Sequence, residues 1–306
     1  MLSISSRWVV LTALLIATNA GATIGSQSPV RSRTLNGVSY VIHVGGAPGS
    51  GSGMAGAMLT RSPTYTANAV FAGGRGRLDI VDGGVESVFA KGDYVLFDST
   101  DLVIVHPAKR EFVLLPQDAA SKRMDQLEAM GIKVTIGDVK VVLDSLAGSD
   151  TVAGHATRHF RMTTGFTMTI AAGGMGQQLT TESNTDYWVA QIPGLPGNPL
   201  LRANGFAGAP MSAGMFRDLS VRVDSAAARM GGAVALRTST LSRLIEGPES
   251  SVQMQQTSEV SNLRDQMVDE SVLILPAGYT QGVLPGMDSV SRGDAGRKWR
   301  LPVRRR

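Results

Sequence analysis

The sequence predicts a mainly β fold with a few helices, of the α+β class, in which the strands run antiparallel. Two observations lead to this prediction. Short runs rich in Val, Ile, Thr, Tyr and Phe follow one another along the chain, separated by glycine, proline and aspartate turn signals. The runs come too close together for the crossover helices that parallel strands need, and few segments carry a helical pattern.

The first predicted elements form an antiparallel meander. A strand is expected at residues 38–44 (VSYVIHV), and the glycine-dense stretch 45–56 is expected to end it as a loose hairpin loop. Asp82-Gly83-Gly84, Lys91-Gly92-Asp93 and Pro107 mark turns between further strands. These strands are predicted at residues 77–81, 85–90, 94–98, 102–106 and 111–115.

One segment interrupts the strands. Residues 116–130 combine good helix formers with an acidic residue in the first turn, and Gly131 provides a stop. Ala120, Met124 and Leu127 fall on one side of such a helix. A single amphipathic helix is therefore expected here.

The second half of the chain returns to strands. Residues 193–216 hold prolines, glycines and scattered Leu, Phe and Met, and we interpret them as a lid or flap over an apolar surface. A helix is expected at residues 217–230. Strands are predicted at residues 132–136, 139–145, 157–163, 167–171 and 179–192, and closing strands at 233–244, 252–263 and 272–275.

Residues 1–22 are typical of a secretory signal peptide. Arg7 supplies a positive charge, residues 8–17 form an apolar run too short to cross a bilayer, and Ala20-Gly21-Ala22 provides a small-x-small cleavage site. We expect a periplasmic or secreted mature chain that starts near Thr23. The chain contains no cysteine, so neither disulfides nor a lipid-anchored cysteine is expected.

The basic charge is concentrated at the end of the chain. The domain prediction is a signal peptide at 1–22, a single domain at 23–287 and a disordered tail at 288–306. The tail holds seven basic and two acidic residues, a net charge of +5. The whole chain has a net charge of +4, so the rest of the chain sums to −1. The main domain therefore lacks the basic field that nucleic-acid binding needs. Residues proposed to contact an anionic envelope surface are Arg297, Lys298, Arg300, Arg304, Arg305 and Arg306; a solvated terminus is the alternative.

Several short motifs follow one another in a recognisable order. They are 77–80 (RLDI), 91–98 (KGDYVLFD), 105–112 (VHPAKREF), 154–160 (GHATRHF), 186–190 (DYWVA) and 275–279 (LPAGY). This order resembles that of the envelope proteins related to the lipoprotein carrier LolA, and more closely an exported family of unknown function with that kind of strand order. The likeness spans about Gly37 to Tyr279.

The resemblance implies a strongly curved, unclosed antiparallel sheet, a half-barrel whose concave side is covered by helices or loops and can hold acyl chains. It brings no catalytic residues and no cofactor. The chain has 14 methionines, which suit promiscuous apolar grooves but also ordinary core packing. The residues proposed to line a ligand groove and its flap are Met162, Phe166, Met168, Leu200, Leu201, Phe206, Met211, Met215 and Phe216.

Candidates for chemistry fail on geometry. His155 and His159 lie in a predicted strand, where a spacing of four residues covers about 13 Å, too far for two ligands of one metal ion. The G-x-G-x-x-G match at 51–56 lacks a following helix and a βαβ unit. The aspartates between residues 79 and 101 lack a calcium-loop spacing and suit turns. Trp188 is expected to anchor the core. No metal is expected.

The sequence therefore predicts a non-enzymatic exported protein that binds or carries a hydrophobic, lipid-like molecule in the envelope. The alternative is a structural or interaction scaffold that docks a protein partner through a sheet edge or the basic tail. A hydrolase is a third reading, but no G-x-S-x-G elbow, P-loop or cysteine nucleophile supports it. No transmembrane span is expected in the mature chain.

Overall fold

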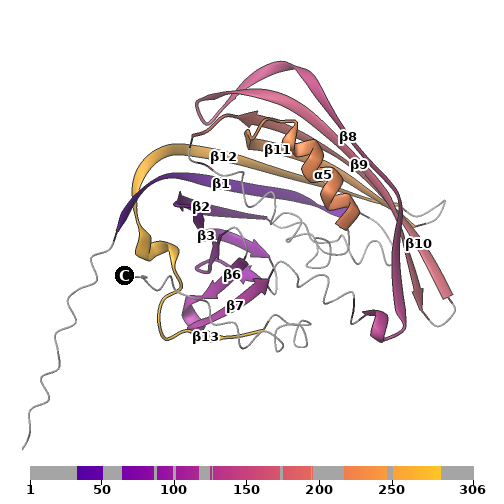
Figure 1. The fold of residues 1–306 in the computed structure, drawn as a ribbon, viewed down its shortest axis with the longest axis horizontal. Coiled ribbons are helices and arrows are strands. Elements are labelled where there is room, and N and C mark those ends of the chain that lie inside the picture. Colours follow the sequence, from indigo (N-terminus) through magenta and orange to yellow (C-terminus); the bar gives the residue numbers. More distant parts are fainter. Residues whose placement is uncertain are drawn as a thin grey trace, which may run out of the picture. The chain divides into compact units, whose positions relative to one another are not determined.

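The strands form one open antiparallel sheet whose long members arch over in Figure 1. The structure, a computed structural model, describes residues 33–50, 64–85, 88–98, 101–116, 125, 127–172, 175–193, 195, 217–246 and 251–283. All of these belong to one unit of the chain, Arg33–Arg306.

Most of the long strands lie in the second half of the described chain. The strands of the first half are β1 (Thr34–Ser50), β2 (Thr64–Ala72), β3 (Arg75–Val85), β4 (Phe89–Ala90), β5 (Tyr94–Phe97), β6 (Asp101–His106) and β7 (Glu111–Pro116), with the short 3-10 helix η1 (Pro107–Lys109) between β6 and β7. The second half contains β8 (Ile132–Val152), β9 (His155–Ala172), β10 (Met175–Ala190), α5 (Arg217–Ala228), β11 (Val234–Ile245), β12 (Ser251–Asp269), η2 (Glu270–Leu273) and β13 (Thr280–Gln281).

Strand β1 joins the two halves of the sheet. The strand order is β13-β7-β6-β5-β3-β2-β1-β12-β11-β10-β9-β8, with β4 paired to β3. β1 pairs with its chain neighbour β2 on one side and with β12, from the end of the chain, on the other. Only the short β13–β7 pair is parallel among the described strands. The predicted antiparallel, mainly β fold with an open sheet is therefore confirmed.

Adjacent strands share an outer and an inner face, and the pairing register assigns residues to each. His43, Glu259, Arg237, Trp188 and His159 stand opposite one another across β1, β12, β11, β10 and β9, so they share the outer face. Because successive residues alternate between faces, their chain neighbours point inward. Around β1 to β3 and β12 the inner face carries much of the largest core cluster, including Ile42, Ala67, Phe71, Leu78 and Val260.

Several predicted boundaries are wrong. β1 continues through Gly45 to Ser50 instead of opening into a loop. β2 was not predicted at all, and residues 85–90 are divided between β3 and β4. The predicted strands at 132–136 and 139–145 are one strand, as are those at 157–163 and 167–171.

Two further predictions concern helices and the chain end. The helix predicted at 217–230 is confirmed as α5. Pro116 ends β7, so the other predicted helix does not start there; residues 125 and 127–129 are helical, and the rest of that segment is outside the described residues. The closing strand predicted at 272–275 is wrong, because Asp269 accepts a hydrogen bond from the Ser271 backbone N–H and starts η2.

Candidate functional site

Three of the proposed groove residues share the inner face of β9. The β9–β10 pairing has no register shift between residues 158 and 172, so Met162, Phe166 and Met168 all point to the same side. Met162 is buried, whereas Phe166 and Met168 are half-buried. The other six proposed residues, between 200 and 216, lie outside the described residues, as do the signal peptide, the 51–56 motif and the basic tail.

Helix α5 covers part of this face and lies under the arch of β8 and β9 in Figure 1. Ala226 of α5 and Met230, just after the helix, pack with Phe160, Met162 and Val189 into one buried cluster. Met162 is 3% exposed. It is therefore an ordinary core residue rather than part of a groove.

Beyond α5 the inner face carries an apolar zone. On β8, Ile132, Val134 and Ile136 are half-buried and alternate with the exposed Lys133 and Thr135. Their row runs alongside the half-buried inner residues of β9, and Leu179, Leu244 and Val252 form a buried cluster next to it. We define the apolar zone as the half-buried Ile132, Val134, Ile136, Phe166, Met168 and Ile170; the buried Leu179, Leu244 and Val252 continue its face as core residues.

A band of hydroxyl groups lies between α5 and the apolar zone, on β9 to β12. Three cross-strand pairs hydrogen-bond within it: Ser183 with Ser242 at 3.0 Å, Thr185 with Thr240 at 3.1 Å, and Thr238 with Ser258 at 2.7 Å. Thr164 extends the band onto β9 opposite Ser183. We call these seven residues and Gln256 the hydroxyl zone.

Gln256 is the unsatisfied member of the hydroxyl zone. It stands on β12 opposite Thr240 on one side and Gly46 on the other. Its Nε2 is buried and has no hydrogen-bond acceptor in the described part of the chain. A buried donor without a partner costs about 1–3 kcal/mol, so an acceptor atom that reached this amide would remove that cost.

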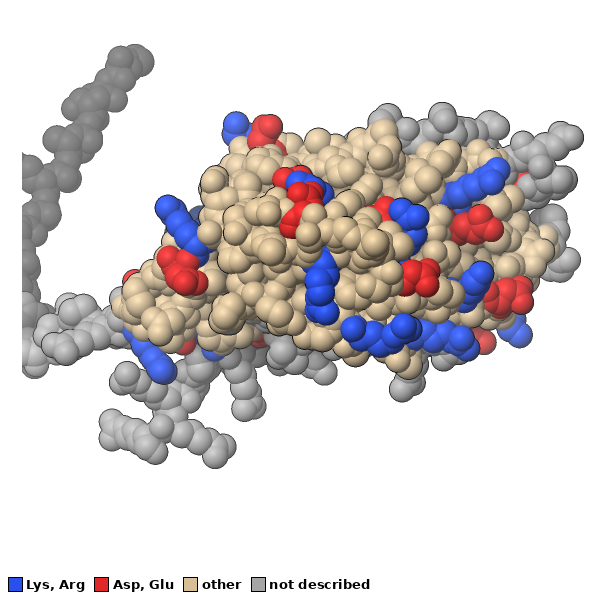
Figure 2. All heavy atoms as spheres, turned by 90° about the horizontal axis from the view of Figure 1, so that it is seen from above, with Lys and Arg blue, Asp and Glu red and all other residues tan. Residues whose placement is uncertain are grey.

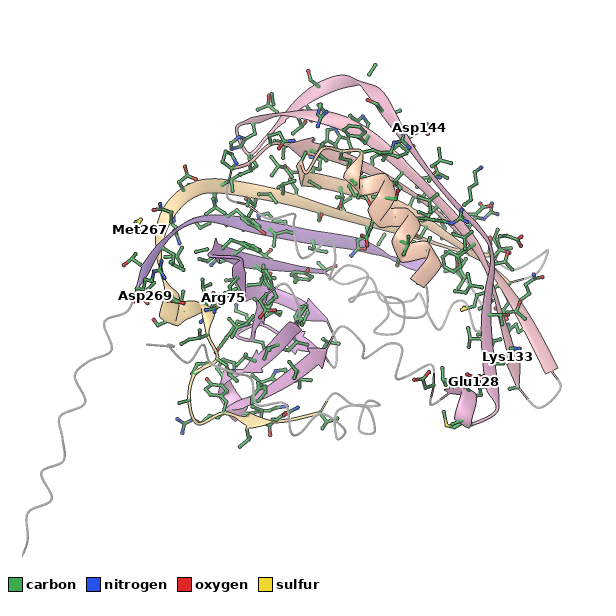
Figure 3. All side chains as sticks on the ribbon, in the orientation of Figure 1. Arg75, Glu128, Lys133, Asp144, Met267 and Asp269 are labelled. Atoms are coloured by element: carbon green, nitrogen blue, oxygen red, sulfur yellow. The ribbon has the colours of Figure 1, made fainter. Side chains whose placement is uncertain are left out.

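Charged side chains are kept off both zones. None of the residues that define the apolar and hydroxyl zones is charged. Seen from above in Figure 2, Lys, Arg, Asp and Glu are instead scattered over the face of the arch that is turned to the viewer. Lys133 and Asp144 of β8 project away from the arch in Figure 3. The two zones themselves are apolar and hydroxylic, but Glu246, which accepts a hydrogen bond from Gln177 opposite Ile170, lies at the border of the apolar zone.

A polar network covers the outer face behind these zones. The Arg161 guanidinium donates two hydrogen bonds of 2.9 Å to the carboxylate of Asp186, which also lies 3.1 Å from Nε2 of His159. Partial burial acts to raise the pKa of Asp186, but the hydrogen bonds and charge of Arg161, with His159, hold that pKa below its usual value. Every charged group of this network has a partner, which indicates a structural role.

The ring of Trp188, on β10, contacts side chains of both neighbouring strands in this network. The ring of His159 stacks on it with centroids 4.5 Å apart, and the Arg237 guanidinium lies 5.5 Å from its centroid. Arg237 in turn binds Asp150 at 2.6 Å and Glu259 at 2.9 Å. Trp188 is half-buried against the main core cluster, as expected for a core anchor.

Several of the residues considered for metal binding have other partners. His159 is engaged by Trp188 and Asp186. Asp79 binds Arg77, and Asp93 lies 2.9 Å from Nδ1 of His106 and accepts the Ala90 backbone N–H. Within the described ranges, no group of three or more His, Asp or Glu side chains could hold a metal ion.

The hydroxyl zone is the part of the site that sequence reasoning missed. Its Ser and Thr residues alternate along β10 and β11, but each run alone resembles an ordinary polar strand. Only the register shows that these hydroxyls face inward and meet across strands.

No protein-family model matches this chain, and no curated protein is significantly similar to it. Among the described residues, no helix has the length and apolar character needed to cross a membrane.

Proposed function

We propose that this chain is a non-catalytic, exported envelope protein that binds an amphiphilic, lipid-like molecule on the inner face of its open sheet. The observation that carries the proposal is the apolar zone lying beside an uncharged hydroxyl zone, with the free Nε2 of Gln256 between α5 and the apolar zone.

The two zones match the two parts of an amphiphile. An acyl chain on the half-buried apolar zone would remove Ile136, Met168 and their neighbours from water, and each buried methylene contributes about 0.8 kcal/mol. The hydroxyl zone offers hydrogen bonds to oxygen atoms of a head group but no charge, and the nearby carboxylate of Glu246 would repel an anionic one. The ligand class is therefore an acyl chain with an uncharged, oxygen-bearing head.

The resemblance to the LolA-related proteins supports the same role. An unclosed sheet with a helix on its inner face fits the half-barrel that the resemblance implies. The expected signal peptide would bring the chain to the compartment where such a carrier acts.

Native mass spectrometry of the protein purified gently from the periplasm tests this function. A co-purifying mass, released by organic extraction and identified as an acylated molecule, is the expected result. A clean apo mass in a protein that also takes up no fluorescent acylglycerol would contradict the proposal.

A docking scaffold is the second candidate, favoured by one observation. β8 forms a long edge of the described sheet, where it is paired with β9 alone. Deleting residues 292–306 tests whether the basic tail carries the association with the envelope. Loss of that association with unchanged acylglycerol uptake would favour docking through the tail.

A further inference from the structure

The long edge strand β8 is open to pairing. It has 21 residues, and β9 is its only strand partner in the described sheet. Most side chains that alternate with its half-buried apolar residues are exposed, including Lys133, Lys140 and Asp144. An exposed edge of this length presents a row of backbone donors and acceptors to another strand.

We propose that β8 pairs with β8 of a second copy of this chain, antiparallel, with Lys133 of each copy opposite Asp144 of the other. In this register the two-fold axis passes between residues 138 and 139, and residues 132–137 of one copy face residues 140–145 of the other. The interface is therefore isologous.

The bulge in β8 makes this register consistent with both faces of the sheet. Its pairing with β9 shifts between Gly137 and Lys140, so the alternation of faces changes phase there. Across the proposed interface, Val134 meets Leu143 and Ile136 meets Val141, and all four are inner-face residues. The apolar inner surface would continue from one copy to the next.

Charge complementarity selects this register among its neighbours. On the outer face, Asp144 stands opposite Arg161, which stands opposite Asp186. Lys133 makes no ion pair with a described residue of its own chain. In the dimer, Lys133 of the second copy would stand next to Asp144 of the first, so that positive and negative charges alternate along Lys133, Asp144, Arg161 and Asp186 on four adjacent strands. Sliding the pairing by two residues places Lys133 opposite Val142 or Leu146 and loses both ion pairs.

Helix α5 restricts the edge only weakly. Arg222 lies 3.5 Å from the carbonyl oxygen of Val139, and Arg229 lies 3.4 Å from that of Leu143. Both contacts are at the long limit of hydrogen bonding, and both come from exposed side chains that can turn away. A pairing strand can therefore replace them.

Sedimentation equilibrium of the full chain tests the proposal by charge exchange. We expect a concentration-dependent dimer, with a dissociation constant at least about tenfold higher in Lys133→Asp and in Asp144→Lys, since each turns two attractions into two repulsions. The double variant, Lys133→Asp with Asp144→Lys, restores the two ion pairs between the copies and should recover dimerisation in part, because Asp144→Lys also places a second cation beside Arg161. Circular dichroism checks that each variant is folded.

Disulfide formation provides an independent readout because the chain has no cysteine of its own. Combined Lys133→Cys and Asp144→Cys substitutions should yield a covalent dimer under mild oxidation, whereas Lys133→Cys alone should not. A wild-type chain that stays monomeric at all concentrations, or a charge-exchanged double variant that dimerises no better than either single variant, would overturn the proposal.

Discussion

At the scale of single residues, the unpaired amide of Gln256 separates a binding role of the inner face from a purely structural one. In Gln256→Leu the buried donor disappears, so the free energy of unfolding should stay level or rise by about 1 kcal/mol. The affinity for a fluorescent acylglycerol should fall by about 5- to 10-fold, the value of one lost hydrogen bond. Urea unfolding and fluorescence titration measure the two effects.

The neighbouring Gln255 provides a matched control. It is exposed on the outer face of the same strand, so Gln255→Leu should leave acylglycerol affinity unchanged. Equal losses of affinity in the two variants would show that Gln256 does not meet the ligand.

Asp186 makes a pH-dependent prediction at the same scale. Its pKa is lowered in the folded chain, so its contribution to stability is complete above the ordinary aspartate pKa and is lost as the pH falls through the folded value. Asp186→Asn should cost about 1 kcal/mol at pH 7, and this difference should shrink below about pH 4. Urea unfolding between pH 7 and pH 3 measures it.

The exposed carboxylate of Asp224 on α5 offers the comparison for this experiment. Asp224→Asn should change the free energy of unfolding little at any pH in that range. A pH-independent loss in Asp186→Asn would argue against the ion pair with Arg161 as the cause.

At the scale of elements, β1 depends on close backbone packing at Gly37. A Cβ atom placed there would lie 2.1 Å from the Phe71 carbonyl oxygen and 2.8 Å from a methyl group of Val268. Gly37→Ala should therefore destabilise the fold by about 1–3 kcal/mol, the usual cost of overpacking. Gly176→Ala in β10 is the control, because nothing lies within 4 Å of a Cβ atom placed there. Thermal unfolding compares the two variants, and equal melting temperatures would contradict the packing argument.

The elements that sequence reasoning found are those whose local signals agree with their pairing. β5 to β7 have β-branched or aromatic runs and turn residues at both ends, so they were predicted within a residue or two. β2 was missed because Ala67, Asn68 and Ala69 have low strand propensity, although the two alanines are fully buried.

Pairing partners explain the other differences in the elements. Gly45 and Gly46 stay in β1 because Thr257 and Gln256 of β12 pair with them, an interaction between distant parts of the chain. The same holds for the site: an alternating Ser and Thr pattern is visible in the sequence, but only the register between β10, β11 and β12 turns it into a hydroxyl zone.

At the scale of the whole molecule, the binding proposal predicts that stability depends on ligand occupancy. A molecule that binds only the folded chain stabilises it by about 2.7 kcal/mol when its free concentration is 100 times its dissociation constant. Removing the bound lipid by gentle solvent exchange should therefore lower the melting temperature, and adding back the extracted molecule should restore it. A chain truncated after Met287 should behave in the same way, because the apolar and hydroxyl zones lie within β8 to β12. If instead adding the extracted molecule leaves the melting temperature unchanged and the truncation abolishes envelope association, the protein is a docking scaffold. Its inner face would then serve only as part of the hydrophobic core.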